Sequence, residues 1–151
     1  MMGLLSANNK VWLSKSENPE RKLKYTLQII ENKKSMVGVN THLTNKIVLE
    51  ALEENSIKEL KNLDNIKSEV KFGKNTRFDF LISKNNKKIF VEVKNVTLSR
   101  KKGVAEFPDA VTARGLKHIN ELINASKRGF ETYLLFLIPV SYTHLTLPTT
   151  T

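Results

Sequence analysis

Two carboxylates with metal-binding potential lie within one stretch, FDFLISKNNKKIFVEVK, at residues 78–94. The Asn85-Asn86 pair between its two β-rich arms favours a two-residue hairpin turn. With this turn, positions whose numbers sum to 171 face each other across the two strands, which places Asp79 opposite Glu92. Facing residues lie about 4.5 to 5.5 Å apart at Cβ, and like charges there are destabilising. The pair therefore needs a physical reason.

A bound divalent cation is one such reason. When two carboxylates share a partly buried site, either one takes up a proton or a cation lies between them. Mg²⁺ commonly uses one or two carboxylates and fills its shell with waters and phosphate oxygens. Lys94, two residues beyond Glu92, points to the same face and could orient a water or stabilise charge on a phosphate. The alternative is a solvated strand face on which Arg77 and Lys94 neutralise the two acids without any ligand.

The predicted register separates the hairpin into two faces, and this clean separation supports the register itself. One face is wholly apolar and carries Phe78, Phe80, Ile82, Ile89, Val91 and Val93. The other carries Arg77, Asp79, Leu81, Phe90, Glu92 and Lys94.

The remaining elements predict an α/β protein with a mixed β-sheet flanked by helices. Before the hairpin, the patterns indicate a strand pair in residues 10–31, a short strand at 36–40, a helix after Thr44 as N-cap and a strand at 66–72. After the hairpin, they indicate a helix at 112–127 and a buried strand at 132–138. The apolar face of the second helix is expected to consist of Leu116, Ile119, Leu122 and Ile123. The three central strands form a meander.

Charge and composition favour a polyanionic partner. The 151 residues include 25 Lys and Arg against 15 Asp and Glu, a formal net charge of +10, which points to nucleic acid; a solvated basic surface is the alternative. The absence of cysteine excludes disulfides and thiolate metal sites. The apolar run at 133–140 is too short to span a bilayer, and no signal peptide is visible. We therefore expect a cytoplasmic protein without membrane association.

An acid on one strand followed by Glu-x-Lys on the next resembles the active-site signature of the PD-(D/E)XK nuclease superfamily. Five segments also resemble, in order, the sugar fermentation stimulation protein (SfsA) family: VWLSKSENPERKLKYT, VGVNTHLTNKIVLEAL, KSEVKFGKNTRFDF, VEVKNVTL and EFPDAVTARGLKHINEL. The resemblance covers roughly residues 2–138. It implies a nuclease-like fold, DNA binding, and a link to the regulation of sugar (maltose) metabolism. The basic charge favours DNA binding that is largely independent of sequence.

The resemblance also implies a domain organisation. Members of the family are longer and begin with an OB-like β-domain, so we expect a fragment. Residues 1–35 would be the last part of the OB-like domain, and residues 36–138 would be most of the nuclease-like domain, without its C-terminal part. Residues 139–151 are Thr-rich and lack any period, and we interpret them as a non-native tail.

Carried over to this sequence, the family pattern assigns catalytic roles to Asp79, Glu92 and Lys94 and Mg²⁺ binding to the two carboxylates. A third acidic ligand stays open between Glu50, on the first predicted helix, and Glu69, on the strand before the hairpin. An active Mg²⁺-dependent endonuclease is the alternative to a protein that uses this domain chiefly for binding DNA.

Basic residues with expected roles in DNA binding occur in three regions. They are Arg21, Lys22, Lys24, Arg77, Arg100, Lys101, Lys102, Arg114 and Lys117. Phosphate contacts compete here with the simpler interpretation of solvated charge. Asp109 and Thr112 fit N-cap positions, and His118 is interpreted as a structural helix residue.

Overall fold

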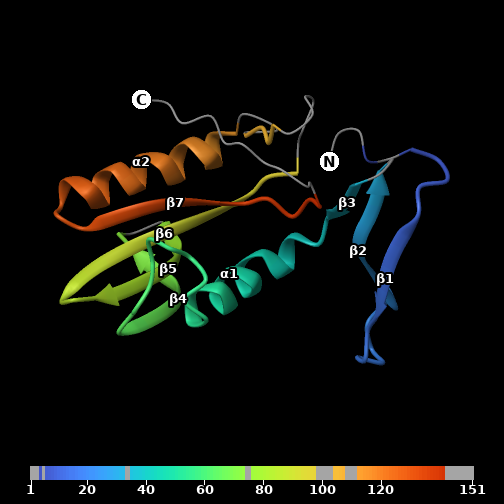
Figure 1. Ribbon diagram of the computed structural model, residues 1–151, viewed down its shortest axis with the longest axis horizontal. Coiled ribbons are helices and arrows are strands. Elements are labelled where there is room, and N and C mark those ends of the chain that lie inside the picture. The colour runs from blue at the N-terminus through green and yellow to red at the C-terminus, as the bar shows by residue number, and fades with distance from the viewer. Residues whose placement is uncertain are drawn as a thin grey trace. The chain divides into compact units, whose positions relative to one another are not determined.

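The computed structural model describes residues 4, 6–32, 35–73, 76–97, 104–107 and 112–141. They form two compact units (Figure 1). The first contains the described residues of Met1–His42, Asn95–Ala110 and Ile138–Thr151, and the second those of Leu43–Lys94 and Val111–Leu137. No helix in the described ranges is long and apolar enough to cross a membrane.

The first unit is built on a three-stranded antiparallel sheet of β1 (Val11–Lys15), β2 (Tyr25–Asn32) and β3 (Ser35–Gly38), in that order. A small apolar cluster of Leu4, Ile30, Val37 and Val39 supports it. The structure groups β3 with the first two strands, whereas the resemblance predicts that residues from 36 onward belong to the nuclease-like part.

The first three residues of the expected tail, 139–141, pack beside β3 in the first unit. Gly38 donates its backbone N–H to the carbonyl of Pro139 at 2.7 Å, and Met36 donates to Ser141 Oγ at 2.8 Å. Val37 forms an antiparallel bridge with Val140. Residues 139–141 therefore lie along the edge of β3, and residues 142–151 of the expected tail lie outside the described residues.

The second unit has a mixed sheet with a helix on each face, as the sequence predicts (Figure 1). A 3₁₀ turn at Thr41–Leu43 leads into this unit, whose elements are α1 (Thr44–Glu53), β4 (Asn65–Phe72), β5 (Thr76–Lys84), β6 (Lys87–Asn95), α2 (Ala113–Lys127) and β7 (Glu131–Leu137). The strand order is β4-β5-β6-β7. Helix α1 packs Val48 and Leu52 on the cluster that contains Phe80 and Val91. Helix α2 packs Leu122 and Ala125 on the other face.

The predicted hairpin turn is confirmed, and the predicted register is confirmed as far as Phe80 opposite Val91. Asn85 and Asn86 have positive φ angles of 49° and 63°, which are those of a type I′ turn and which Asn tolerates better than most residues. The ladder between β5 and β6 runs from Lys84 opposite Lys87 to Phe80 opposite Val91. Regular pairing ends there, one position before Asp79 and Glu92.

Strand β5 changes face at Asp79. The ladder between β4 and β5 omits Glu69 and Asp79, and Glu69 has a φ of 55°. Beyond this irregularity, the ring of Phe78 contacts those of Phe72 and Phe90 at centroid distances of 5.2 and 5.0 Å. The prediction that Phe78 shares the face of Phe80 is therefore wrong, because the strands lose their regular alternation at Asp79; the other five apolar positions of that face are buried in one cluster.

The predicted N-cap of the first helix is also wrong. Thr44 is the first residue of α1 and is buried, and the N-cap position is Leu43, in a helical conformation without a side-chain cap. The 3₁₀ turn runs directly into α1, so the chain already turns before Thr44. Asn40 Oδ1 accepts the N–H of His42 within that turn at 3.2 Å.

The predicted N-cap of the second helix is confirmed and yields a stability prediction. Thr112 has an extended backbone, and its Oγ1 accepts the N–H of Gly115 at 3.0 Å. We expect Thr112→Ala to lower the free energy of unfolding by about 1 kcal/mol, since an N–H of the first turn loses its partner. Urea unfolding followed by circular dichroism measures this change. Thr112→Ser keeps the acceptor and serves as the control; equal losses in both variants would contradict a capping role.

Candidate functional site

Glu92 is a buried carboxylate with one oxygen bound and one free. It lies on β6 and is only 2% exposed. Its Oε1 accepts a hydrogen bond from Lys94 Nζ at 2.5 Å and contacts Nδ1 of His118, which comes from α2. Its Oε2 is buried and has no hydrogen-bond partner among the described residues. A buried carboxylate oxygen without a partner is costly, which makes this atom a candidate ligand.

Asp79 is anchored through both of its oxygens. Oδ2 accepts the backbone N–H of Val93 at 2.7 Å, and Oδ1 accepts from Asn45 Nδ2, at the start of α1, also at 2.7 Å. The irregularity of β5 makes the first bond possible, because the carboxylate takes an N–H of the neighbouring strand at the point where the regular ladder has ended. Asp79 is thereby tied to the strand that carries Glu92.

The two carboxylates fit a hydrated divalent cation. Mg²⁺ and Ca²⁺ take oxygen ligands, and Mg²⁺ in particular needs only one or two carboxylates because it retains water. Glu92 offers its free Oε2, and each Asp79 oxygen accepts one hydrogen bond from the described residues. Within the ranges that the structure describes, no three acidic, His or Cys side chains gather as a metal cluster. The residues present thus suit a site completed by water or phosphate.

Neither candidate for a third acidic ligand joins this pair. Glu50 is exposed on α1. Glu69 is exposed on β4 and forms an ion pair with Arg77 at 3.6 Å. Within the described part of the chain, neither side chain forms a group of three metal-ligand residues with Asp79 and Glu92.

A hollow lined by cations lies next to Glu92. It measures about 500 Å³ and is lined by Thr76, Arg77, Ala113, Arg114, Lys117 and His118. We call it the cationic hollow. Three residues with predicted DNA-binding roles, Arg77 from β5 and Arg114 and Lys117 from α2, meet here. His118 belongs both to this wall and to the surroundings of Glu92, so the hollow and the carboxylate are neighbours.

The other predicted DNA-binding residues lie elsewhere. Arg21, Lys22 and Lys24 are exposed between β1 and β2 of the first unit, where Arg21 Nη1 donates to Thr26 Oγ1 at 2.7 Å. The predictions for Arg100, Lys101, Lys102 and Asp109 fall outside the described residues.

Two residues of the site were not predicted in this role: Asn45 was not a candidate, and His118 was interpreted as structural. Asn45 holds Asp79, and His118 holds Glu92. Both lie within segments that carry the family resemblance, VGVNTHLTNKIVLEAL and EFPDAVTARGLKHINEL. Their position in these two segments was the available signal for a role at the site. Distance along the sequence gave none, because neither residue is close to the carboxylates in the chain.

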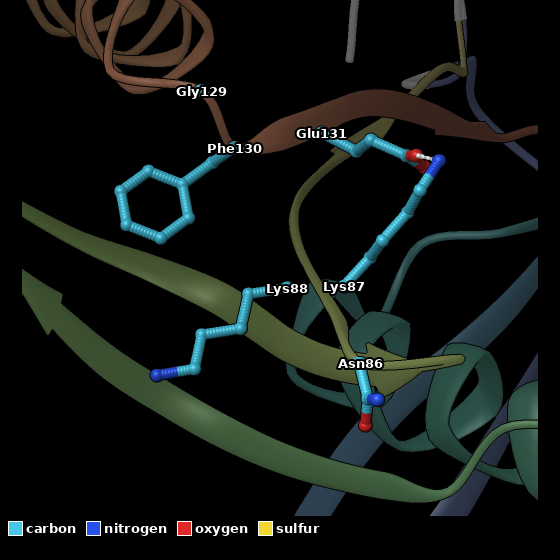
Figure 2. A pocket seen from close by; sticks show the side chains of 6 residues that line it. All are labelled: Asn86, Lys87, Lys88, Gly129, Phe130 and Glu131. Atoms are coloured by element: carbon cyan, nitrogen blue, oxygen red, sulfur yellow. Dashed lines mark hydrogen bonds and ion pairs between the residues drawn. The ribbon is translucent and has the colours of Figure 1, made fainter.

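A second hollow, at the hairpin turn, contains a surface ion pair. It measures about 420 Å³ and is lined by Asn86, Lys87, Lys88, Gly129, Phe130 and Glu131 (Figure 2). Lys87 Nζ contacts Glu131 Oε1 at 2.7 Å, and the hydrogen bond and charge of Glu131 raise the pKa of Lys87. Both side chains are well exposed, so the pair contributes little to stability. Lys87 and Glu131 thus satisfy each other's charge.

Comparison with known proteins identifies relatives over both units. Residues 1–39 match the model of the SfsA N-terminal OB domain, and residues 42–150 match that of the sugar fermentation stimulation protein RE domain. A sugar fermentation stimulation protein homolog from Pelagibacter ubique is 59% identical over 140 residues, covering 93% of this chain and 60% of that protein. The homolog from Brucella anthropi is 45% identical over 139 residues, covering 91% and 60%. The chain thus spans about 60% of the length of these curated relatives.

A solved structure is also similar. The structure of Pyrococcus furiosus SfsA in complex with Ca²⁺ superposes with a TM-score of 0.76 at 29% sequence identity. The match covers 85% of this chain and 54% of that one. The relative, at least, was solved with a divalent cation of the kind that the carboxylate pair suits.

Proposed function

This chain belongs to the sugar fermentation stimulation protein family, and we propose that it binds DNA through the cationic hollow. The observation that carries the proposal is the convergence of Arg77, Arg114 and Lys117 on one hollow from two separate elements. Arg77 also forms an ion pair with Glu69 outside the lining, but the lining itself contains no acidic residue, and such an excess of positive charge suits a polyanion. We further propose that DNA binding serves the regulation of sugar (maltose) metabolism, in keeping with the name of the relatives.

The chemistry of the hollow fits the phosphate backbone of DNA. Arginine presents its N–H groups in a planar fork that matches two phosphate oxygens, and lysine adds a point charge. Contacts to phosphates fix the position of a protein on DNA but carry no sequence information. The net charge of +10 adds a long-range attraction. We therefore expect binding that is largely independent of sequence.

The salt dependence of DNA binding tests this proposal. For duplex DNA, the slope of log K against log salt is about −0.9 per phosphate neutralised. We expect the double variant Arg77→Ala/Arg114→Ala to weaken binding and to make this slope about 2 units shallower, since each lost phosphate contact removes about one unit. Fluorescence anisotropy with a labelled duplex at several salt concentrations provides the measurement.

The matched control is Lys58→Ala/Lys61→Ala, which removes the same charge from exposed positions outside the cationic hollow. This control is expected to retain most of the slope. Equal losses in the two double variants would mean that DNA is held by diffuse charge rather than by the hollow. A wild-type affinity for duplex DNA that does not change with salt concentration would contradict the proposal.

A second candidate function is metal-dependent cleavage of the DNA backbone, favoured by the buried, unpartnered Oε2 of Glu92 beside the hollow. Asp79 and Glu92 would hold Mg²⁺, as the Ca²⁺ in the structure of the Pyrococcus relative suggests. A bound Mg²⁺ lowers the pKa of its water and neutralises charge on the phosphate. Lys94, whose Nζ already lies against Glu92, would position the attacking water, and the cationic hollow would hold the adjoining phosphates.

A further inference from the structure

We propose that His118 is a positioning residue that fixes the carboxylate of Glu92 so that Oε2 is its ligand oxygen. This inference rests on the proposed role of Asp79 and Glu92 in holding a divalent cation. It adds a function for a side chain that comes from a different element, helix α2, and that the sequence analysis interpreted as structural.

The distribution of donors on Glu92 is the first argument. Both hydrogen-bonding partners, Lys94 and His118, meet Oε1, whereas Oε2 is buried without a partner in the described structure. Lys94 comes from the same strand, and its long side chain adapts to several carboxylate rotations. His118 has a rigid ring on a packed helix, so it defines one rotation. The carboxylate is therefore oriented chiefly by His118.

The place of His118 on α2 is the second argument. Leu122 and Ala125, four and seven positions further along, are the buried residues of this helix and face the sheet. His118 continues the same side toward the N-terminus of α2, and its side chain is 17% exposed. Packing of the helix thus holds the imidazole against Glu92, and the same residue lines the cationic hollow. The residue joins the two halves of the site.

A purely structural role would have a different signature. If His118 only satisfied a buried acid, its removal would lower stability and leave the preference for a cation unchanged. A positioning residue affects the affinity of the carboxylates for metal, because ligands that lose their outer hydrogen bonds typically bind metal about 10 to 100 times more weakly. Metal affinity and stability therefore separate the two roles.

The test is titration calorimetry of the 151-residue chain with Mn²⁺ alone. We expect His118→Ala to raise the dissociation constant for Mn²⁺ about 10- to 100-fold. His118→Asn is expected to restore most of the affinity, because the Nδ2 of asparagine can donate from nearly the place of the histidine Nδ1. Asn120→Ala, an exposed substitution on the same helix, controls for nonspecific effects. Thermal unfolding of each metal-free variant records whether it folds.

A spectroscopic readout supplements the titration. The positioning role requires Nδ1 of His118 to be the donor to Glu92 Oε1, and ¹⁵N NMR of the metal-free chain should show a proton on Nδ1. The signature should change in Glu92→Gln. Unchanged Mn²⁺ affinity in a folded His118→Ala, or a ring protonated only at Nε2, would overturn the role of His118 alone. A wild-type chain that takes up no Mn²⁺ would overturn the metal role of Asp79 and Glu92, and this inference with it.

Discussion

Asp79→Asn is expected to lower Mn²⁺-dependent cleavage of plasmid DNA at least about 100-fold, the scale of losing one preorganised electrostatic group in an active site. The substitution removes the negative charge that would hold the cation and changes little else. The amide oxygen that it introduces can still accept the N–H of Val93, and the new amide nitrogen can donate to Asn45 once the side chain of Asn45 has turned. We therefore expect the free energy of unfolding to fall by no more than about 1 kcal/mol.

The structure offers a matched control for this experiment. Asp64 also accepts a backbone N–H, that of Asn85 at 2.9 Å, but it is exposed at the turn end of the hairpin. Asp64→Asn should leave cleavage unchanged. Cleavage that survives Asp79→Asn would point to a contaminating nuclease or to another site, and a wild-type chain without Mg²⁺- or Mn²⁺-dependent cleavage would remove the second candidate function while leaving DNA binding open.

The hairpin could be predicted because its determinants are local. Two consecutive asparagines set the turn, and alternation in the arms sets the faces, so the register from Phe80 to Val91 followed from the letters alone. The irregularity at Asp79 could not be foreseen. It depends on a positive φ at Glu69, on a separate strand, and no Gly marks that position. The same irregularity anchors Asp79 on Val93, so the least predictable point of the sheet lies at the candidate site.

The orientation of α2 explains why His118 was missed. Its apolar residues predicted a face that includes Leu116 and Ile123, but these side chains are 60% and 47% exposed. The helix instead turns Leu122 and Ala125 toward the sheet, which brings His118 to Glu92. The rotation of α2 about its axis follows from its packing on the apolar cluster that contains Phe72, Phe78 and Phe90. Residues from all four strands of the sheet contribute to this cluster. A helical pattern alone contains none of that information.

The cationic hollow also depends on how α2 packs on the sheet. Arg77 and Arg114 are predicted phosphate contacts from distant parts of the chain, and only the packing of α2 on the sheet brings them to one place. Sequence identified the charges as candidates but could not tell which of the predicted basic residues would cooperate. Three of them now line one hollow, whose His118 also contacts Glu92, which is why DNA binding and metal binding are proposed for neighbouring places.

The largest loss of stability is expected from substitution of Phe80, whose side chain is 1% exposed in the core that packs against α1. Phe80→Ala should lower the free energy of unfolding by about 3 to 5 kcal/mol, because a large cavity replaces a fully buried ring. Leu23→Ala, at a side chain that is 70% exposed, should change it by less than about 0.5 kcal/mol. Urea unfolding measures both, and similar losses would contradict the burial of Phe80.

A double-mutant cycle extends this prediction to the change of face at Asp79. Phe80 and Leu52 share one cluster, whereas Phe78 lies in the cluster on the other side of the sheet. Phe80→Leu and Leu52→Ala should therefore couple, by about 0.5 kcal/mol or more, while Phe78→Leu and Leu52→Ala should be additive within about 0.5 kcal/mol. Regular alternation predicts coupling for both pairs, since it puts Phe78 and Phe80 on one face. Equal coupling energies would indicate that β5 alternates regularly through Asp79. They would thereby contradict the irregularity that allows Asp79 to accept the N–H of Val93.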